Sequence, residues 1–485
     1  MPTKFVYSPN GTVTKWGFLC DDEDGEDIDE IQEMFKVYLD QEAADEARRK
    51  GLRDIPSVED TKRLVTDYLR VIYAHVRRSI QANTGSWRDM KVEFIFSMPT
   101  TWQSLSTTMD FEKAIRAAGF GEENTSKHTA RLELTEAEAA AVYVAGNPQV
   151  RFAAGDILLV CDAGGGTTDL GLIEVMDSDP NLPSLKQVNA VKGVGIGSTM
   201  IDRAFQQLVQ RRLDIHPDAQ VVLPHNLAFK LSRSTAFRSI KHKFGTGSGD
   251  QPGYKLALDR LGLGISQEFS HPGLRVDRGR MIFLRAEIQS LFDNQIRGIV
   301  RRIDEQLAWM SANRSSQSVR YLVLSGGLGG SPYVKTQLDA QYAQTRMSII
   351  RSQEPRLSVV KGLVMDRRQR LVTGTAALKT RIARSSYGVL CRQTYDPNYH
   401  VGAEVDYDDY NKSQKWALYQ IEWLIRKVLA SFSNHMDPSR RQHPKPTNRL
   451  TLNRATPSTP IPPLRSLLPR RSNQETRVAN GILLL

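Results

Sequence analysis

The sequence is poor in cysteine and has no long apolar run. Its 485 residues include only three cysteines, Cys20, Cys161 and Cys391, which lie far apart. This spacing supports neither a disulfide framework nor a zinc site made of cysteine alone. No stretch approaches the roughly 18 apolar residues of a membrane helix, and the N-terminus lacks the basic and then apolar shape of a secretory signal. We therefore expect a cytoplasmic protein with no membrane partner.

Positive charge is in excess, but it is unevenly distributed. The net charge is +11, and residues 431–485 contain nine basic and two acidic residues, which leaves only +4 for residues 1–430. The main part of the chain is therefore only mildly basic, and we expect no nucleic-acid partner. With 40% hydrophobic and 25% charged residues, the composition is that of a globular protein with material for more than one core.

The C-terminal segment 431–485 is rich in proline, with serine and threonine between the prolines. Such a composition buries too little apolar surface to offset the entropy of ordering, so we predict that this segment is disordered. Three interpretations remain open for it: an inert extension, an incorrectly placed gene end, or a functional basic tail.

Before this segment, strand-like and helix-like patterns alternate, which is typical of α/β architecture. Residues 5–7 and 12–17 predict a β-hairpin around Asn10-Gly11. A helix is expected to begin after Ser57. Residues 92–96 predict a strand, and the alanine-rich residues 136–144 predict a helix.

The strongest chemical signal is a glycine-rich bend between two apolar, strand-like segments. The residues of this bend and its flanks that we single out are Asp162, Gly164, Gly165, Gly166, Thr167, Thr168 and Asp169. Glycines without Cβ atoms let backbone N–H groups converge on an anion. The threonine hydroxyls can meet a phosphate oxygen, and the aspartates can hold Mg²⁺ through water or orient a hydrolytic water. The pattern predicts a phosphate site; the alternative is a tight hairpin whose aspartates are turn residues.

A second glycine-rich bend follows about 160 residues later. Residues 320–325 predict a buried strand, Gly326 and Gly327 follow it, and a helix is expected with Ser331 as N-cap and Pro332 as first residue. The two glycines would let the backbone lie flat against a nucleoside near a helix N-terminus. Strand–glycine–helix turns occur throughout α/β folds, so this bend gains its meaning from the first one.

In this order, the segments resemble the actin-like ATPase superfamily, and specifically the DnaK-type heat shock protein 70 chaperones in a divergent, fungal-like branch. Residues 162–169 resemble the family's second phosphate motif, and residues 325–332 resemble its adenosine motif. Further segments that carry the resemblance are the strand-ending residues 97–102, the interlobe connecting helix at 135–141 and the glycine turn at 197–202. The resemblance covers about residues 1–427.

The resemblance implies an α/β, actin-like (ribonuclease H-like) two-lobed fold that binds ATP and Mg²⁺ between its lobes. It implies catalytic roles for Asp162, Thr167 and Asp169, with both aspartates linked to Mg²⁺, and a nucleotide-sensing role for Glu136. Lys241 would line the adenosine pocket, or else belong to a solvated helix face. Unfolded protein clients and co-chaperones would be the partners.

The sequence also departs from the family. The first phosphate loop, Asp-x-Gly-Thr-Thr-x-Ser, is absent, and the chain starts at what looks like a later strand of the same sheet, so the fold is expected to be N-terminally incomplete. Losing even one preorganised donor can cost about a hundredfold in rate. Gly330 stands where many members place an arginine against adenine, and Lys36 is a possible phosphate-reaching lysine without a distinctive local pattern.

We accordingly predict lobe I at 1–150, lobe II at 151–395, a C-terminal extension of the family at 396–430 and the disordered tail at 431–485. The predicted function is that of an ATP-binding, chaperone-like ATPase. Two alternatives stay open: a nucleotide-binding or interaction module without turnover, which the missing loop favours, and a small-molecule kinase, for which no convincing aspartate base is found in the first half.

Overall fold

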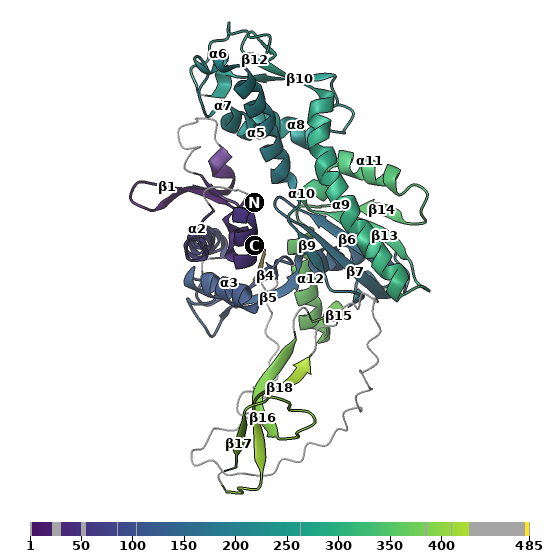
Figure 1. The fold of residues 1–485 in the computed structure, drawn as a ribbon. Coiled ribbons are helices and arrows are strands. Elements are labelled where there is room, and N and C mark those ends of the chain that lie inside the picture. Colours follow the sequence, from purple (N-terminus) through teal and green to yellow (C-terminus); the bar gives the residue numbers. More distant parts are fainter. Residues whose placement is uncertain are drawn as a thin grey trace. The chain divides into compact units, whose positions relative to one another are not determined.

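The computed structural model of the chain describes residues 2–21, 31–49, 55–84, 86–102, 104–261, 263–383, 386–408, 410–425 and 481–484. These residues form a mixed α/β structure with five β-sheets (Figure 1), which confirms the predicted α/β class. None of the described helices combines the length and the apolar character that crossing a lipid bilayer requires.

The N-terminal segment begins with the predicted hairpin. Strands β1 (Lys4–Tyr7) and β2 (Val13–Trp16) are antiparallel, and Gly11 in their turn has a positive φ of 79°, as an Asn-Gly turn favours. Strand β3 (Gln32–Glu33) pairs with the other edge of β1. The elements that follow are η1 (Gly17–Asp21), η3 (Phe35–Leu39), α1 (Gln41–Arg49) and α2 (Val58–Thr84).

A second small sheet is built on β4 (Val92–Met98), which runs parallel to β5 (His128–Thr135), with α3 (Leu105–Ala117) between them in the chain. Phe94 and Phe96 of β4 pack with the apolar face of α2 in one aromatic-rich core. The other edge of β4 is taken by β19 (Gly481–Leu484), also parallel. These four residues are the part of the predicted disordered segment, 431–485, that the structure describes. The rest of that prediction falls outside the described residues.

The largest sheet has seven strands in the order β14-β13-β6-β7-β8-β15, with β9 paired to β7. Strands β14, β13 and β6 are mutually parallel, whereas β7 is antiparallel to both β6 and β8. Its strands are β6 (Ile157–Ala163), β7 (Thr168–Asp177), β8 (Ser184–Gln187), β9 (Lys192–Val194), β13 (Val319–Ser325), β14 (Ser348–Arg351) and β15 (Leu378–Thr380).

Both faces of this sheet are covered, as its continuous apolar strands require. Leu159 of β6 packs in a core with α9 (Arg285–Asn313), and its neighbour Leu158 packs in another with α4 (Glu136–Ala145) and α12 (Ser358–Thr373). Figure 1 shows α9 and α12 beside the sheet. Helix α4 thus shares the core of the seven-stranded sheet, although it precedes the boundary that we predicted at residue 150.

The segment between β9 and β13 forms a helical part with its own antiparallel sheet, in the order β10-β12-β11. The rings of Phe205 in α5 and Phe237 in α8 stack with their centroids 3.8 Å apart, which joins the two helices. The elements of this segment are α5 (Ser198–Ile215), α6 (Pro217–Gln220), α7 (Leu227–Arg233), α8 (Thr235–Lys243), β10 (Gly253–Ala257), η4 (Asp259–Leu261), β11 (Val276–Asp277) and β12 (Arg280–Leu284), in addition to α9. Helices α10 (Gly326–Gly329) and α11 (Pro332–Gln341) follow β13.

The last described part before residue 426 is a three-stranded antiparallel sheet. It contains β16 (Tyr387–Thr394), β17 (Val405–Tyr407) and β18 (Lys415–Ile425), and β18 pairs with both of the others. The boundary that we predicted between residues 395 and 396 therefore lies inside this sheet and separates β16 from its partner strands.

Candidate functional site

The first glycine bend closes the β6–β7 hairpin. The strands pair with Asp162 directly opposite Asp169. The Gly164 amide donates a hydrogen bond of 2.8 Å to the Thr167 carbonyl, and this bond closes the bend. The register therefore brings the two predicted aspartates to facing positions at the end of two buried strands.

The second glycine bend contacts the first. Strand β13 runs parallel to β6 and aligns Ser325 with Asp162. Gly326 has a φ of +80°, and a Cβ atom at this position would lie 2.3 Å from the Ala163 carbonyl oxygen and 2.7 Å from Asp162 Oδ1. Only glycine permits so close an approach with this backbone conformation. The structure thus brings together the two glycine bends that the sequence analysis singled out, at the carboxyl ends of adjacent parallel strands.

The local geometry of the second bend differs from the prediction in two details. Residues Gly326–Gly329 form a single helical turn, α10, instead of an open loop. Ser331 does occupy the N-cap position of α11, with Pro332 at the first turn, but its hydroxyl makes no capping hydrogen bond. Its buried Oγ lacks a hydrogen-bond partner among the described residues.

Three carboxylates gather at the contact between the bends: Glu136, Asp162 and Asp169. Burial raises the pKa of Asp162 to about 7, and the negative charge of Glu136 adds to this rise. Burial and Glu136 also raise the pKa of Asp169 well above its usual value. Asp162 Oδ1 and Asp169 Oδ1 are both buried and accept no hydrogen bond from the described residues. Hydrogen bonds from Ser325 and Thr100 partly offset this rise of the two pKa values, but buried negative charge is costly unless a cation or proton neutralises it.

The residues present therefore fit the predicted magnesium ion. Mg²⁺ takes oxygen ligands, keeps several water molecules and is usually held by one or two carboxylates together with phosphate oxygens. Asp162 and Asp169 supply two such carboxylates with free oxygens. Gly193 lets the backbone at Thr101 come close to them, because a Cβ atom on Gly193 would lie 2.7 Å from Asp169 Oδ1 and 2.8 Å from the Thr101 nitrogen.

The glycines of the two bends differ in whether a Cβ atom would clash at their positions. A Cβ atom on Gly165 or Gly327 would meet nothing within 4 Å, and one on Gly166 would meet only Val37 at 3.9 Å. Neither Gly165 nor Gly327 has a positive φ. Packing does not require glycine at these two positions, so bare backbone faces open space there, as the approach of a phosphate or nucleoside would require.

The two threonines of the first bend have different surroundings. The Thr167 hydroxyl donates to Asp169 Oδ2 at 3.3 Å, so it stays at the acidic site. Thr168 is fully buried, and its hydroxyl donates to the Ile196 carbonyl at 2.7 Å. Thr168 therefore ties β7 to the segment before α5, and its hydroxyl proton is not available to a phosphate oxygen, contrary to our expectation.

The start of α5 holds the first bend from the other side. The amides of Ser198 and Thr199 donate to the carbonyls of Gly164 and Gly165 at 3.1 and 2.9 Å. A Cβ atom on Gly197 would lie 2.2 Å from the Gly165 carbonyl oxygen. The glycine turn at 197–202 is thus in contact with the bend at 162–169, with which it shares the family resemblance.

Lys36 joins the site although its local sequence gave little reason to expect it. Its Nζ lies 3.5 Å from Glu136 Oε1, and the side chains are 37% and 19% exposed. The neighbouring Val37 approaches Gly166. The partners lie 100 residues apart in the chain, and only the way that η3 packs against the first bend brings this lysine to the carboxylates.

Lys241 lies in an ion pair and is not a solvated surface residue. Its Nζ contacts both carboxylate oxygens of Asp202 at 2.6 and 2.7 Å, and its side chain is only 12% exposed. Burial raises the pKa of Asp202, and Lys241 counteracts this effect. The helix that carries Lys241 nevertheless lies close to the second bend. Gly245, just beyond α8, packs against Tyr333 in α11, and a Cβ atom on Gly245 would lie 2.6 Å from Tyr333 Cβ.

Comparison with known families finds a match over a small part of the chain. Residues 381–430 match a domain of unknown function, DUF8568. No curated protein matches the sequence. The matched segment begins at Arg381, whose Nη2 pairs with Glu138 Oε2 of α4 at 3.0 Å, and it continues through the sheet of β16, β17 and β18. It is therefore attached to the helix that carries Glu136.

Proposed function

We propose that this protein binds Mg·ATP where the two glycine bends meet, as an actin-like ATPase domain of the heat shock protein 70 type. The observation that carries the proposal is the contact of the two bends around Asp162, where Gly326 approaches its carboxylate and a buried oxygen lacks a partner. Burial and Glu136 make the charged form of these two acids costly in a purely structural hairpin, whereas a bound cation would stabilise that form.

In this proposal each bend takes one end of the nucleotide. The backbone amides at Gly165 and Gly166 face the phosphates, and the open backbone at Gly327 faces the nucleoside. Asp162 and Asp169 hold Mg²⁺ through water, and Thr167 stays hydrogen-bonded to Asp169. Bound Mg²⁺ would neutralise phosphate charge and stabilise the charge that develops on phosphoryl transfer. Lys36 leaves Glu136 to meet a phosphate oxygen, a small rearrangement because both side chains are partly exposed.

The finer features of the family belong to the same proposal. The part that contains β4 and β5 and the part that contains the seven-stranded sheet would act as two lobes, and Glu136 at the start of α4 would report the loss of the γ-phosphate. Arg381 would couple a movement of α4 to the C-terminal sheet, because it forms an ion pair with Glu138, which follows Glu136 by two residues in that helix. Protein clients and co-chaperones would then be the partners, in the cytoplasm.

The second candidate is a nucleotide-binding module without turnover. It is favoured by one specific observation: the sequence contains no Asp-x-Gly-Thr-Thr-x-Ser segment to supply further hydroxyls and an aspartate to the phosphates. The loss of such preorganised groups weakens transition-state stabilisation much more than ground-state binding. Binding and hydrolysis must therefore be measured separately.

Calorimetry of the 485-residue chain with ATP, with and without Mg²⁺, tests binding, and phosphate release tests turnover. We expect Mg²⁺-dependent binding that Asp162→Asn weakens at least tenfold. The matched control is Asp177→Asn, an exposed aspartate at the far end of β7, which should bind like the unaltered chain. Absence of binding would refute the nucleotide site, and binding without phosphate release would establish the second candidate.

A further inference from the structure

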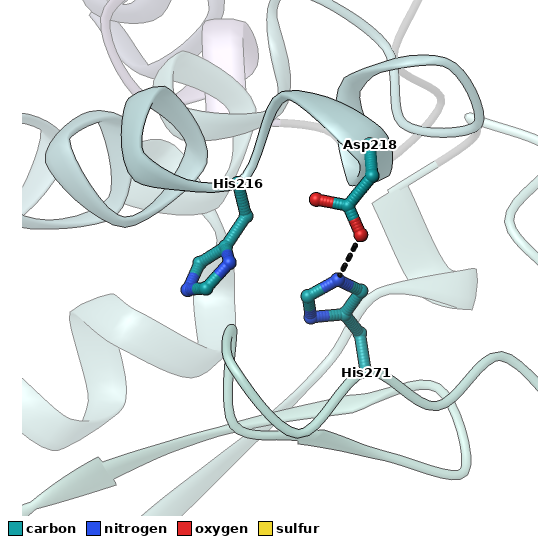
Figure 2. Close-up of side chains that lie close together, drawn as sticks. All are labelled: His216, Asp218 and His271. Atoms are coloured by element: carbon teal, nitrogen blue, oxygen red, sulfur yellow. Dashed lines mark hydrogen bonds and ion pairs between the residues drawn. The ribbon is translucent and has the colours of Figure 1, made fainter.

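A second group of polar side chains lies away from the glycine bends, in the segment between β9 and β13. His216, Asp218 and His271 each offer a ligand atom, and the three atoms lie within 4.8 Å of one another. Figure 2 shows the Asp218 carboxylate joined to the ring of His271, with the ring of His216 beside them. The group takes no part in the proposed nucleotide site.

Two of the three residues are fixed by the turn between helices α5 and α6. His216 separates the helices, and Asp218 is the second residue of α6. Pro217 between them has a restricted φ, and the Ala219 amide donates to the His216 carbonyl at 3.1 Å. Because the backbone is set on both sides, the imidazole and the carboxylate are held near one another without any contribution from an ion.

The third residue comes from the loop before β11. His271 and Val276 exchange two backbone hydrogen bonds of 2.9 and 3.0 Å, which close the loop. Gly273 in this loop lies against the first imidazole, since a Cβ atom there would be 2.3 Å from His216 Cε1. The rings of His216 and His271 are 5.1 Å apart at their centroids. Glycine thus permits the loop to bring the second imidazole beside the first.

The ring of His271 is hydrogen-bonded on both sides. Its Nδ1 accepts from the Leu274 amide at 3.1 Å, so its Nε2 carries the ring proton and donates to Asp218 Oδ2 at 2.9 Å. The Asp218 side chain is 71% exposed and the His271 side chain 18% exposed. An ion can therefore reach the carboxylate from solvent, while the imidazole beside it is already oriented.

We propose that His216, Asp218 and His271 form a binding site for a divalent transition-metal ion, with Zn²⁺ as the best match. Two imidazoles and one carboxylate are a ligand set that Zn²⁺ accepts in tetrahedral geometry, with water at the fourth position. Co²⁺ and Ni²⁺ bind similar nitrogen and oxygen ligands, whereas Mg²⁺ and Ca²⁺ prefer oxygen alone. The site would join the α5–α6 turn to the loop before β11.

Metal binding rearranges one proton. The ion takes the place of the Nε2 proton between His271 and Asp218, and the ring carries its proton on Nδ1 instead, so no net proton is lost from this imidazole. The Leu274 amide then loses its acceptor on Nδ1, which has a free-energy cost because Leu274 is fully buried. This exchange lowers the affinity relative to a fully preorganised site but leaves the ligand set intact.

Titration of the nucleotide-free 485-residue chain with ZnCl₂ by calorimetry, and with CoCl₂ by visible absorption, tests the site. We expect one ion per chain, and visible absorption bands of Co²⁺ in a low-symmetry site. His271→Ala and Asp218→Asn should each weaken Zn²⁺ binding more than tenfold. His225→Gln, which changes an exposed histidine of the next loop, should leave both signals unchanged.

The exposed Asp218 keeps the test decisive if a histidine variant fails to fold, because Asp218→Asn alters no buried group. The proposal is overturned if the unaltered chain does not bind Zn²⁺, or if Asp218→Asn and His271→Ala bind it as tightly as His225→Gln does. Either outcome would leave these residues as a hydrogen-bonded His–Asp pair with a neighbouring imidazole. None of these readouts depends on nucleotide binding, so the failure of one proposal leaves the other standing.

Discussion

The β6–β7 hairpin and the sheet of β16, β17 and β18 are both built of antiparallel strands, yet their surroundings are opposite. Every residue of β6 is buried, and the first six residues of β7 are buried as well. Most residues of β16 and β18 are exposed, and they include Leu390 and Leu424 at 66% and 69%. The hairpin places charged groups where water is excluded, whereas the C-terminal sheet places apolar groups in water.

The difference shows how unusual residues should be interpreted in each region. In a buried hairpin a carboxylate has a free-energy cost, so Asp162 and Asp169 need a reason such as a bound cation. In an exposed sheet an apolar side chain gains little from burial within the chain, and many proteins expose such residues. The acids of the hairpin therefore carry a functional argument that the apolar residues of the C-terminal sheet do not.

The largest effect is expected from alanine at Gly326. The new Cβ atom would meet the Ala163 carbonyl at 2.3 Å with an unfavourable φ of +80°, so the two bends must separate. We expect a loss of about 3 kcal/mol or more in the free energy of unfolding, together with loss of ATP binding. Alanine at Gly327 is the matched control: its Cβ atom meets nothing within 4 Å, so stability should change by less than about 1 kcal/mol.

Urea denaturation and ATP calorimetry of both variants measure this contrast. If Gly327→Ala keeps the stability of the chain but weakens ATP binding, the open backbone at this bend faces the ligand. Equal stability of the two alanine variants would show that the bends do not press together, and the central geometric argument for the site would then be lost.

The second effect concerns the charge of Asp162. Its pKa is raised from 3.8 to about 7, first by burial and then by Glu136. The folded chain therefore keeps a proton that the unfolded chain releases, so the free energy of unfolding falls as the pH rises from about 4 to about 7. We expect Asp162→Asn to be more stable than the unaltered chain at pH 8, by about 2 to 4 kcal/mol, with a smaller gain at pH 5.5.

Urea denaturation without Mg²⁺ at the two pH values measures this gain, with Asp177→Asn as the exposed control. The same Asp162→Asn variant should lose Mg·ATP binding, so that stability and function change in opposite directions. A variant that is less stable at pH 8 would mean that the protein itself already compensates the charge of Asp162, and that no cation is required.

A third, smaller effect tests the link between the two regions. Arg381 is 39% exposed, but its partner Glu138 is only 3% exposed. Arg381→Met leaves that carboxylate with the Thr135 amide as its remaining hydrogen bond among the described residues, and solvent access on the arginine side moderates the cost to about 1 to 2 kcal/mol. Arg116→Met, which removes a surface pair with Glu122, should cost less than about 0.5 kcal/mol. Equal losses in urea denaturation would show that Arg381 does not anchor the C-terminal sheet.

Much of the local structure could be predicted because its signals lie in short segments. The Asn-Gly hairpin, the helix after Ser57 and the apolar strands around the first bend all follow from neighbouring residues. The contact of the bends was expected only from the order of the motifs. Its geometry depends on the parallel register of Ser325 with Asp162, for which no local rule exists.

The contacts that the sequence did not reveal are those between residues far apart in the chain. Lys36 gains its role from a partner 100 residues away, and Lys241 is held by Asp202, which belongs to a turn that we had noted for other reasons. The strand β16 was separated from β18 because their pairing spans more than 20 residues.

The smallest effect is expected from Leu390→Ala in β16. Since this side chain is 66% exposed, its truncation should lower the free energy of unfolding by less than about 0.5 kcal/mol. Leu159→Ala is the matched control in β6: its side chain is fully buried, and the cavity should cost about 2 to 5 kcal/mol. Urea denaturation of both variants measures the two losses in the free energy of unfolding. If Leu390→Ala costs as much as Leu159→Ala, then the exposed face of β16 is covered in solution, and the contrast between a buried hairpin and an open C-terminal sheet must be abandoned.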